Sequence, residues 1–143
     1  MKVSEVMTRD VRTVSPDQTA KEAASFMLSE DAGSMPVSDG GRLLGMITDR
    51  DIAVRGVAKG CGPETPVREL MTDDVICARD DDDVEEVAAK MSRARVRRMP
   101  IIDSNEQLCG IVSLGDLARG SDGESAHEAL EGVSQPGGQH QQG

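Results

Sequence analysis

The sequence predicts a mixed α/β (α+β) fold in which two β-α-β-β-α repeats pack as a pseudo-twofold pair, followed by a disordered C-terminal tail. Two observations support this prediction. Short blocks of sequence recur in the same order 64 or 65 residues apart, and both copies show the same succession of strand-like and helix-like patterns. Two such repeats, each with helices on one face of its sheet, can bury their exposed sheet surfaces by packing together.

The repeat is visible in three pairs of blocks. The first two pairs have an offset of 64 residues, and one additional residue in a turn of the second copy changes the offset of the last pair to 65. Matched blocks in one order, with a single insertion at a turn, indicate a duplicated unit. The pairs are Val3–Thr8 with Val67–Thr72, Met35–Val37 with Met99–Ile101, and Gly45–Ile52 with Gly110–Leu117.

The domain boundaries follow from this alignment and from local composition. We predict repeat 1 over residues 1–58 and repeat 2 over residues 67–120, joined by a linker over 59–66 that is dense in Gly and Pro. Residues 121–143 contain no Lys, Arg or aromatic residue and end in Gln and Gly, so we expect a disordered tail there.

The first strand and the first helix are predicted in the same way in both copies. A short β-rich piece, Val11–Val14 or Val75–Ala78, precedes a capping box whose N-cap is Thr19 or Asp83. A helix should begin directly after each N-cap. Its core-facing stripe follows the i, i+3, i+4, i+7 pattern: Ala20, Ala23, Ala24, Met27 and Leu28 in the first copy, and Val84, Val87, Ala88 and Met91 in the second.

Two strands around a turn and a second helix complete each copy. A second helix is expected from Thr48 to Gly56 and from Ser113 to Gly120, and its short amphipathic part leaves apolar surface available for homodimerisation. The expected strands are Met35–Ser38 and Arg42–Ile47 in the first copy, and Met99–Ile102 and Gln107–Val112 in the second.

Composition excludes several classes of protein. The 143 residues carry 16 Lys and Arg against 26 Asp and Glu, a formal charge of −10, and Phe26 is the only aromatic residue. Nucleic-acid binding depends on basic residues that neutralise phosphates and on aromatic stacking, so it is not expected. No apolar run has the roughly 20 residues of a membrane span, and no signal peptide is visible, so we expect no membrane association and a cytoplasmic protein.

Catalytic and metal-binding constellations are not expected. The only histidines, His127 and His140, lie in the predicted tail, so no His-assisted nucleophile and no His zinc site can form in the folded part. The cysteines Cys61, Cys77 and Cys109 have unrelated spacings and are interpreted as reduced thiols. The acidic run Asp80–Asp83 lacks the Gly and the final Glu of a calcium loop, which favours a solvated turn before a helix. We therefore predict no enzyme and no metal site.

Two hydroxyl-x-x-Asp motifs carry the functional signal: Thr48 with Asp51, and Ser113 with Asp116. One interpretation is a helix cap, in which the hydroxyl accepts a hydrogen bond from the helix backbone and the acid lies near the positive helix end. The other is a ligand site, because a strand-to-helix junction offers free N–H groups to a phosphate and a carboxylate can accept two ribose hydroxyls. Both interpretations can hold in one protein.

Together these motifs resemble the CBS (cystathionine β-synthase) domain, and residues 1–120 resemble a stand-alone CBS pair, also called a Bateman module. Any one block is weak, but the ordered set occurs twice. The resemblance is carried by Val6–Thr8 and Leu70–Thr72, by Met35–Asp39 and Arg98–Asp103, and above all by Gly45–Asp51 and Gly110–Asp116.

This resemblance implies a regulatory ligand that contains adenosine, such as AMP, ADP, ATP, S-adenosylmethionine or NAD, held in clefts between the two repeats. Each cleft combines the hydroxyl and Asp of one repeat with the first-strand region and the Met-Pro segment of the other. Carried over, cleft one contains Ile47, Thr48, Asp51, Val75, Ile76, Arg97, Arg98, Met99 and Pro100. Cleft two contains Val11, Arg12, Ser34, Met35, Pro36, Val112, Ser113 and Asp116.

The two clefts differ in charge. Arg98 aligns with Ser34, so cleft one has a guanidinium for phosphate where cleft two has a hydroxyl, with Arg12 as a partial substitute. We therefore expect cleft one to bind the ligand. The basic cluster of Arg93, Arg95, Arg97 and Arg98 is either this anion site or an ordinary solvated face.

The sequence is compatible with two functions. The first is a non-catalytic sensor, in which an adenosine-type ligand shifts the affinity for an unidentified effector protein. The second is a constitutive interaction or dimerisation module in which the hydroxyl-x-x-Asp motifs serve only as helix caps. The predicted partners are thus the ligand, a second copy of the chain and an effector, without nucleic acid or membrane.

Overall fold

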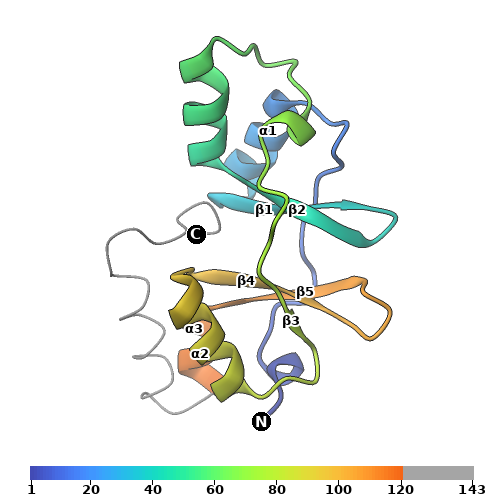
Figure 1. The fold of residues 1–143 in the computed structure, drawn as a ribbon, viewed down its shortest axis with the longest axis vertical. Helices are drawn as coiled ribbons and strands as arrows, with labels where there is room; N and C mark the ends of the chain where they lie inside the picture. Colours follow the sequence, from blue (N-terminus) through green and yellow to red (C-terminus); the bar gives the residue numbers. More distant parts are fainter. Residues whose placement is uncertain (121–143) are drawn as a thin grey trace. The chain divides into compact units, whose positions relative to one another are not determined.

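The computed structural model describes residues 1–120, so the predicted tail lies outside the described residues. These residues form two compact units (Figure 1). One unit is Arg12–Val75, and the other combines Met1–Val11 with the chain from Ile76 onward. Each unit therefore contains the body of one repeat and the opening segment of the other copy. The opening segments are Val67–Thr72, in the unit Arg12–Val75, and Val3–Thr8, in the other unit.

We call Arg12–Val75 the first unit and the other the second unit. The first unit is built on α1 (Ala20–Glu30) and the antiparallel pair β1 (Ser34–Asp39) and β2 (Arg42–Thr48), as predicted. Thr19 Oγ1 accepts a hydrogen bond from the Glu22 amide at 3.1 Å, which confirms this N-cap. The second hydrogen bond of the predicted capping box, from the Thr19 amide to the Glu22 carboxylate, does not form. The Glu22 carboxylate accepts instead from Gln18 Nε2 at 2.7 Å.

The buried face of α1 is narrower than predicted. Ala20, Ala23 and Met27 are buried, whereas Ala24 is exposed and Leu28 has 85% of its surface exposed. The prediction was wrong for these two because a two-stranded sheet covers only a narrow arc of the helix.

The second helix of this unit also differs from the prediction. The chain forms a π-helix, η2 (Asp51–Gly56), followed by a 3₁₀ turn, η3 (Val57–Lys59). The amide of Val57 donates to the carbonyls of both Ala53 and Ile52, so the helical turn is widened at its end. An apolar pattern over six residues is too short to distinguish this geometry from an α-helix.

The second unit contains a three-stranded sheet of β3 (Ala78–Arg79), β4 (Arg98–Ile102) and β5 (Leu108–Ser113). β3 and β4 are parallel, and β4 and β5 are antiparallel. The helices α2 (Val84–Ala94) and α3 (Leu114–Gly120) complete it. The predicted stripe of α2 is confirmed, because all four of its residues are buried.

The predicted capping box of α2 does not form. The Asp83 side chain makes no cap hydrogen bond. The amide of Val84 donates instead to the carbonyl of Met1 at 2.9 Å, so the chain terminus supplies the partner that the side chain does not.

The opening segments take equivalent places in the two units. The amide of Val67 donates to Gln18 O, and the amide of Val3 donates to Asp82 O, both at 2.8 Å. Further along, two hydrogen bonds of 2.9 Å join Thr72 and Met46, while bonds of 2.8 and 2.9 Å join Thr8 and Ile111. The sequence repeat is thus reproduced as a structural repeat, in which each V-x-E-φ-M-T segment (φ, an aliphatic residue) pairs with a strand edge.

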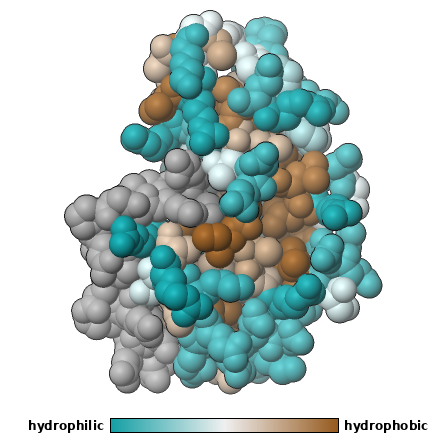
Figure 2. Space-filling model, in the orientation of Figure 1, coloured by the Kyte–Doolittle hydropathy of each residue, from teal (hydrophilic) through white to brown (hydrophobic). Residues whose placement is uncertain are grey.

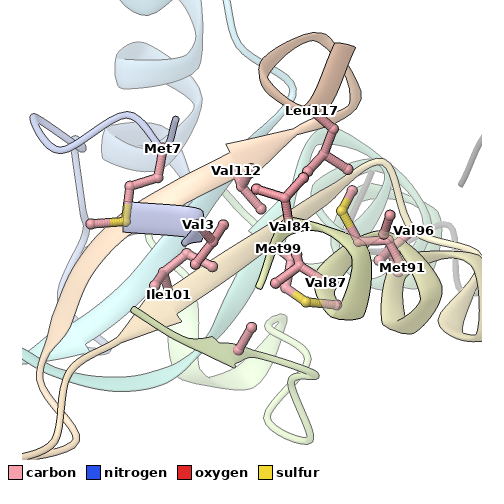
Figure 3. Packing of buried hydrophobic residues seen from close by; sticks show 12 residues of the cluster. Val3, Met7, Val84, Val87, Met91, Val96, Met99, Ile101, Val112 and Leu117 are labelled. Atoms are coloured by element: carbon pink, nitrogen blue, oxygen red, sulfur yellow. The ribbon is translucent and has the colours of Figure 1, made fainter. Parts of the chain in front are cut away.

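The cores show the same exchange. Val3 and Met7 belong to the hydrophobic cluster of the second unit, together with Val84, Met99 and Leu117 (Figure 3). Val67 and Leu70 belong to the cluster of the first unit, around α1 and β1. Each opening segment thus contributes two buried apolar side chains to the unit that contains it.

The predicted first strands are mostly absent. Val11–Val14 forms only an isolated parallel bridge between Val14 and Val37, and Val75–Ala78 is reduced to β3. Pro16 follows the first of these pieces and has no N–H for a ladder, which limits pairing there.

Candidate functional site

Four buried residues of the described chain carry polar side chains: Ser34, Thr48, Asp51 and Asp116. All four belong to the ligand-binding residues that the sequence predicts. Burial of a polar group is unfavourable unless it is hydrogen-bonded, so the partners of these side chains decide what they do.

Thr48 and Asp51 bind each other across the junction between β2 and η2. The Thr48 amide donates to Asp51 Oδ2 at 3.0 Å, and the Asp51 amide donates to Thr48 Oγ1 at 3.0 Å. This reciprocal pair confirms the cap interpretation of the motif. It also fixes the carboxylate at the junction, with only 2% of Asp51 exposed.

Arg55 is the charged partner of Asp51. Its Nε lies 3.7 Å from Asp51 Oδ1, one turn along the helix. Burial raises the pKa of the Asp51 carboxyl above its ordinary value, and the hydrogen bonds from Thr48 and the charges of Arg55 and Arg50 oppose that rise. Sequence reasoning missed Arg55, although its i, i+4 spacing from Asp51 was a signal.

Ser113 and Asp116 repeat this arrangement at the junction between β5 and α3. The Ser113 amide donates to Asp116 Oδ2 at 2.9 Å, and the Asp116 amide donates to Ser113 Oγ at 3.2 Å. Asp116 Oδ1 accepts from Arg119, a second arginine that was not predicted. Both carboxylates therefore meet a backbone amide with one oxygen and a guanidinium with the other.

Strand pairing places the Met-Pro segments beside these motifs. In the first unit, Ser34 pairs with Thr48 and Met35 pairs with Ile47. In the second unit, Arg98 pairs with Ser113 and Met99 pairs with Val112. Ser34 and Arg98 occupy equivalent positions in the two repeats. Each therefore lies next to the hydroxyl residue of its own unit, Thr48 or Ser113.

Each predicted cleft takes residues from both units, so the assembled clefts stay predictions. Within a unit, the structure brings together parts of both clefts. The unit Arg12–Val75 holds Ile47, Thr48, Asp51 and Val75 of cleft one, and Arg12, Ser34, Met35 and Pro36 of cleft two. The other unit holds Ile76, Arg97, Arg98, Met99 and Pro100 of cleft one, and Val11, Val112, Ser113 and Asp116 of cleft two.

The arginines have different surroundings. Arg12 donates to Glu30 Oε1 at 3.4 Å and lies over the Phe26 ring, 4.7 Å from its centroid, so it would have to leave these partners to serve a phosphate in cleft two. Arg97 is exposed, and Arg98 is half-buried at the start of β4.

The other sequence candidates are the acidic run Asp80–Asp83 and the three cysteines. Asp82 Oδ2 accepts from the Arg79 amide at 2.9 Å, so the acidic run stabilises a turn. Residues 1–120 contain no group of three metal-ligating side chains. The cysteines are unpaired, and burial raises the pKa of both Cys77 and Cys109.

No helix in residues 1–120 has the length and apolar character needed to cross a membrane.

The fold and these paired motifs define a tandem CBS protein, and comparison with known proteins shows the family. The CBS domain model matches residues 3–56 and 67–123, so the chain belongs to the CBS domain family. It is 44% identical over 133 residues to the CBS domain-containing protein YhcV of Bacillus subtilis, covering 92% of this chain and 94% of that protein.

Two solved structures extend the comparison. The Hypoxic Response Protein I structure with two coordinated zinc ions has a TM-score of 0.77 and 34% identity, covering 84% of this chain and 98% of that one. The CBS domain pair of protein MJ0100, in complex with 5′-methylthioadenosine and S-adenosyl-L-methionine, has a TM-score of 0.72 and 30% identity, covering 83% and 94%. These matches confirm the predicted fold class.

Proposed function

We propose that this protein is a non-catalytic sensor that binds an adenosine-containing ligand and passes its occupancy to a partner protein. The observation that carries the proposal is the set of four buried polar residues, which coincides with the predicted ligand-binding positions. The complex of the MJ0100 CBS domain pair with 5′-methylthioadenosine and S-adenosyl-L-methionine supports the ligand class. AMP, ADP and ATP are the preferred candidates, followed by S-adenosylmethionine and NAD.

The chemistry of the two motifs suits such a ligand. A buried carboxylate accepts hydrogen bonds from the two ribose hydroxyls, provided that Asp51 or Asp116 gives up part of its present hydrogen bonding. The predicted cleft one combines Asp51 with Arg98, which supplies a cation for a phosphate, whereas within its own unit Arg98 pairs with Ser113 of cleft two. We propose cleft one as the primary site on the basis of this sequence assignment.

Isothermal titration tests the proposal with AMP, ATP, NAD and S-adenosylmethionine, on protein freed of copurified nucleotide. Asp51→Ala should weaken binding about tenfold or more, because hydrogen bonds to a charged group are lost. Asp49→Ala is the matched control, since it removes an exposed carboxylate two residues away and should leave binding unchanged.

The outcomes separate the alternatives. Loss of binding in Asp116→Ala alone would move the site to cleft two. If no ligand produces heat or shifts the melting temperature, the motifs serve only as the observed caps, and the protein is a constitutive interaction module. Nucleotide turnover by pure protein that disappears in Asp51→Ala would contradict a non-catalytic role.

We also propose that the chain forms a homodimer through the helical surface of its first unit. Leu28 is 85% exposed, Val57 70% and Val54 44%, an unusual exposure for large aliphatic residues. Figure 2 shows apolar surface among hydrophilic side chains over the helical end of this unit. Val57→Glu should shift the mass in light scattering from dimer to monomer, whereas Lys59→Glu, on the same turn, should not. A monomeric wild type at micromolar concentration would contradict the proposal.

A further inference from the structure

Arg55 contacts two parts of the first unit at once. Its Nε lies 3.7 Å from Asp51 Oδ1, and its Nη1 donates to the carbonyls of Met71 at 3.0 Å and Leu70 at 3.4 Å. One guanidinium thus joins the buried carboxylate of the proposed ligand site to the end of the opening segment of repeat 2. The planar fork makes these contacts with two separate nitrogens, Nε and Nη1, whereas a Lys ammonium carries all its donors on one nitrogen.

The segment that Arg55 contacts is held against the unit at several points. Its amides donate to Gln18 O and Pro16 O, and Thr72 forms the two-way bridge with Met46. Arg68 also forms an ion pair with Asp17. Three residues beyond Thr72 the chain reaches Val75, a predicted contact of cleft one. The segment is therefore the covalent connection between the Arg55 contact and another part of the same proposed site.

The second unit has no equivalent bridge among its described residues. The position that aligns with Arg55 is Gly120. Asp116 is paired instead with Arg119, and the hydrogen bonds of Arg119 do not extend to the carbonyls of the opening segment Val3–Thr8. The two carboxylates are alike in their caps but differ in what their arginines reach.

We propose that Arg55 is a positioning residue that couples the state of the Asp51 carboxylate to the seating of residues 67–72, and that this coupling exists only in the first repeat. The inference rests on the proposed function for its ligand, but the contacts that carry it exist without one. A ribose hydroxyl that binds Asp51 Oδ1 competes with Arg55 for that oxygen. The guanidinium then shifts toward the carbonyls of Leu70 and Met71, and the segment leading to Val75 becomes more firmly seated.

A ligand-free double-mutant cycle tests the coupling by amide hydrogen exchange. The probes are the amides of Leu70, Met71 and Thr72, each hydrogen-bonded to backbone within the unit. Asp51→Asn removes the charge. In the wild-type background it should change the exchange rates of these three amides about threefold or more, because residues in contact, such as Asp51 and Arg55, show measurable interaction energies. The same substitution should have no such effect in Arg55→Met, which removes the guanidinium but keeps aliphatic bulk.

Two controls separate coupling from general stability. The amides of α1, such as Ala23, report on the whole first unit and should not follow the Asp51 substitution. Arg55→Lys keeps the charge but not the fork, so it should behave as Arg55→Met. An Asp51 effect that persists unchanged in Arg55→Met, or that spreads equally over α1, would overturn the inference.

AMP provides the ligand arm. It should slow exchange at residues 70–72 in the wild type and in Arg119→Met, while Arg55→Met binds AMP without that slowing. If the wild type does not bind AMP, the ligand proposal fails for this nucleotide, and the cycle between Asp51 and Arg55 still decides whether the coupling exists. Binding with equal slowing in Arg55→Met would contradict the inference.

Discussion

The surroundings of Asp51 act on its negative charge in two opposite ways. Burial disfavours the charged carboxylate, and neighbouring hydrogen-bond donors and arginines stabilise it. Burial is the largest influence and raises its pKa, while Thr48, Arg55 and Arg50 act in the opposite direction. The hydroxyl-x-x-Asp pattern was sufficient to predict the partner Thr48, because that contact is local. It was not sufficient to show that the side chain would be 2% exposed.

The raised pKa of Asp51 predicts a specific pH dependence of stability. Between the ordinary value of 3.8 and the raised native value, the native state binds more protons at Asp51 than the unfolded state does. The free energy of unfolding contributed by this residue therefore falls as pH rises through that window. Asp51→Asn does not titrate, so the stability of the wild type relative to this variant should also fall.

Thermal or urea unfolding from pH 3.5 to 7 (roughly the range in which aspartates with raised pKa titrate) measures this difference. The exposed Asp49→Asn serves as the control for general charge effects. A relative stability of the wild type that increases with pH would mean that Thr48 and the arginines outweigh burial.

At the scale of elements, the two long helices have the same predicted capping box but different observed caps. Thr19 caps α1 with its side chain, whereas α2 receives the carbonyl of Met1. Thr19→Ala should therefore lower the free energy of unfolding by about 1 kcal/mol, and Asp83→Ala by clearly less. Chemical denaturation of both variants checks this, and equal losses would show that the Asp83 side chain does cap α2.

Gly45 is an element-scale requirement of the strand edge. A Cβ at this position would lie 2.5 Å from Thr72 O, the acceptor of the bridge from Met46. Gly45→Ala should cost about 1–3 kcal/mol or more, because backbone must move to relieve the overlap. Gly62→Ala is the matched control, since a Cβ there meets nothing within 4 Å. Similar unfolding midpoints for both variants would contradict this close contact.

At the scale of the whole molecule, the exchange of opening segments decides which residues stabilise which unit. Val3 and Met7 are buried in the core formed by residues 78–117, and complete burial of one such side chain contributes about 1.5–3 kcal/mol. Deletion of residues 1–8 should therefore destabilise the second unit more than the first, although the sequence order places these residues in repeat 1.

Hydrogen exchange measures this separately for the two units. Amides of α2 and β5 should exchange much faster after the deletion, and amides of α1 and β2 should change least. Val3→Ala is a milder companion that removes side-chain packing and retains the backbone contacts to Asp82 and Asp80. A larger effect in the first unit would contradict the observed packing of residues 1–8 in the second unit.

The sequence by itself determined the elements whose causes are local. The apolar spacing and the Thr19 cap predicted α1, the paired apolar runs predicted both hairpins, and the hydroxyl-x-x-Asp motifs identified the two capped junctions. The tertiary structure alone decided that residues 1–11 belong with repeat 2, that the second helix of repeat 1 is a π-helix, and that Arg55 connects Asp51 to Leu70 and Met71. The reason is physical: caps and periodicity act within a few residues, whereas the two opening segments carry the same pattern, so only long-range hydrogen bonds and core packing determine which unit each one joins.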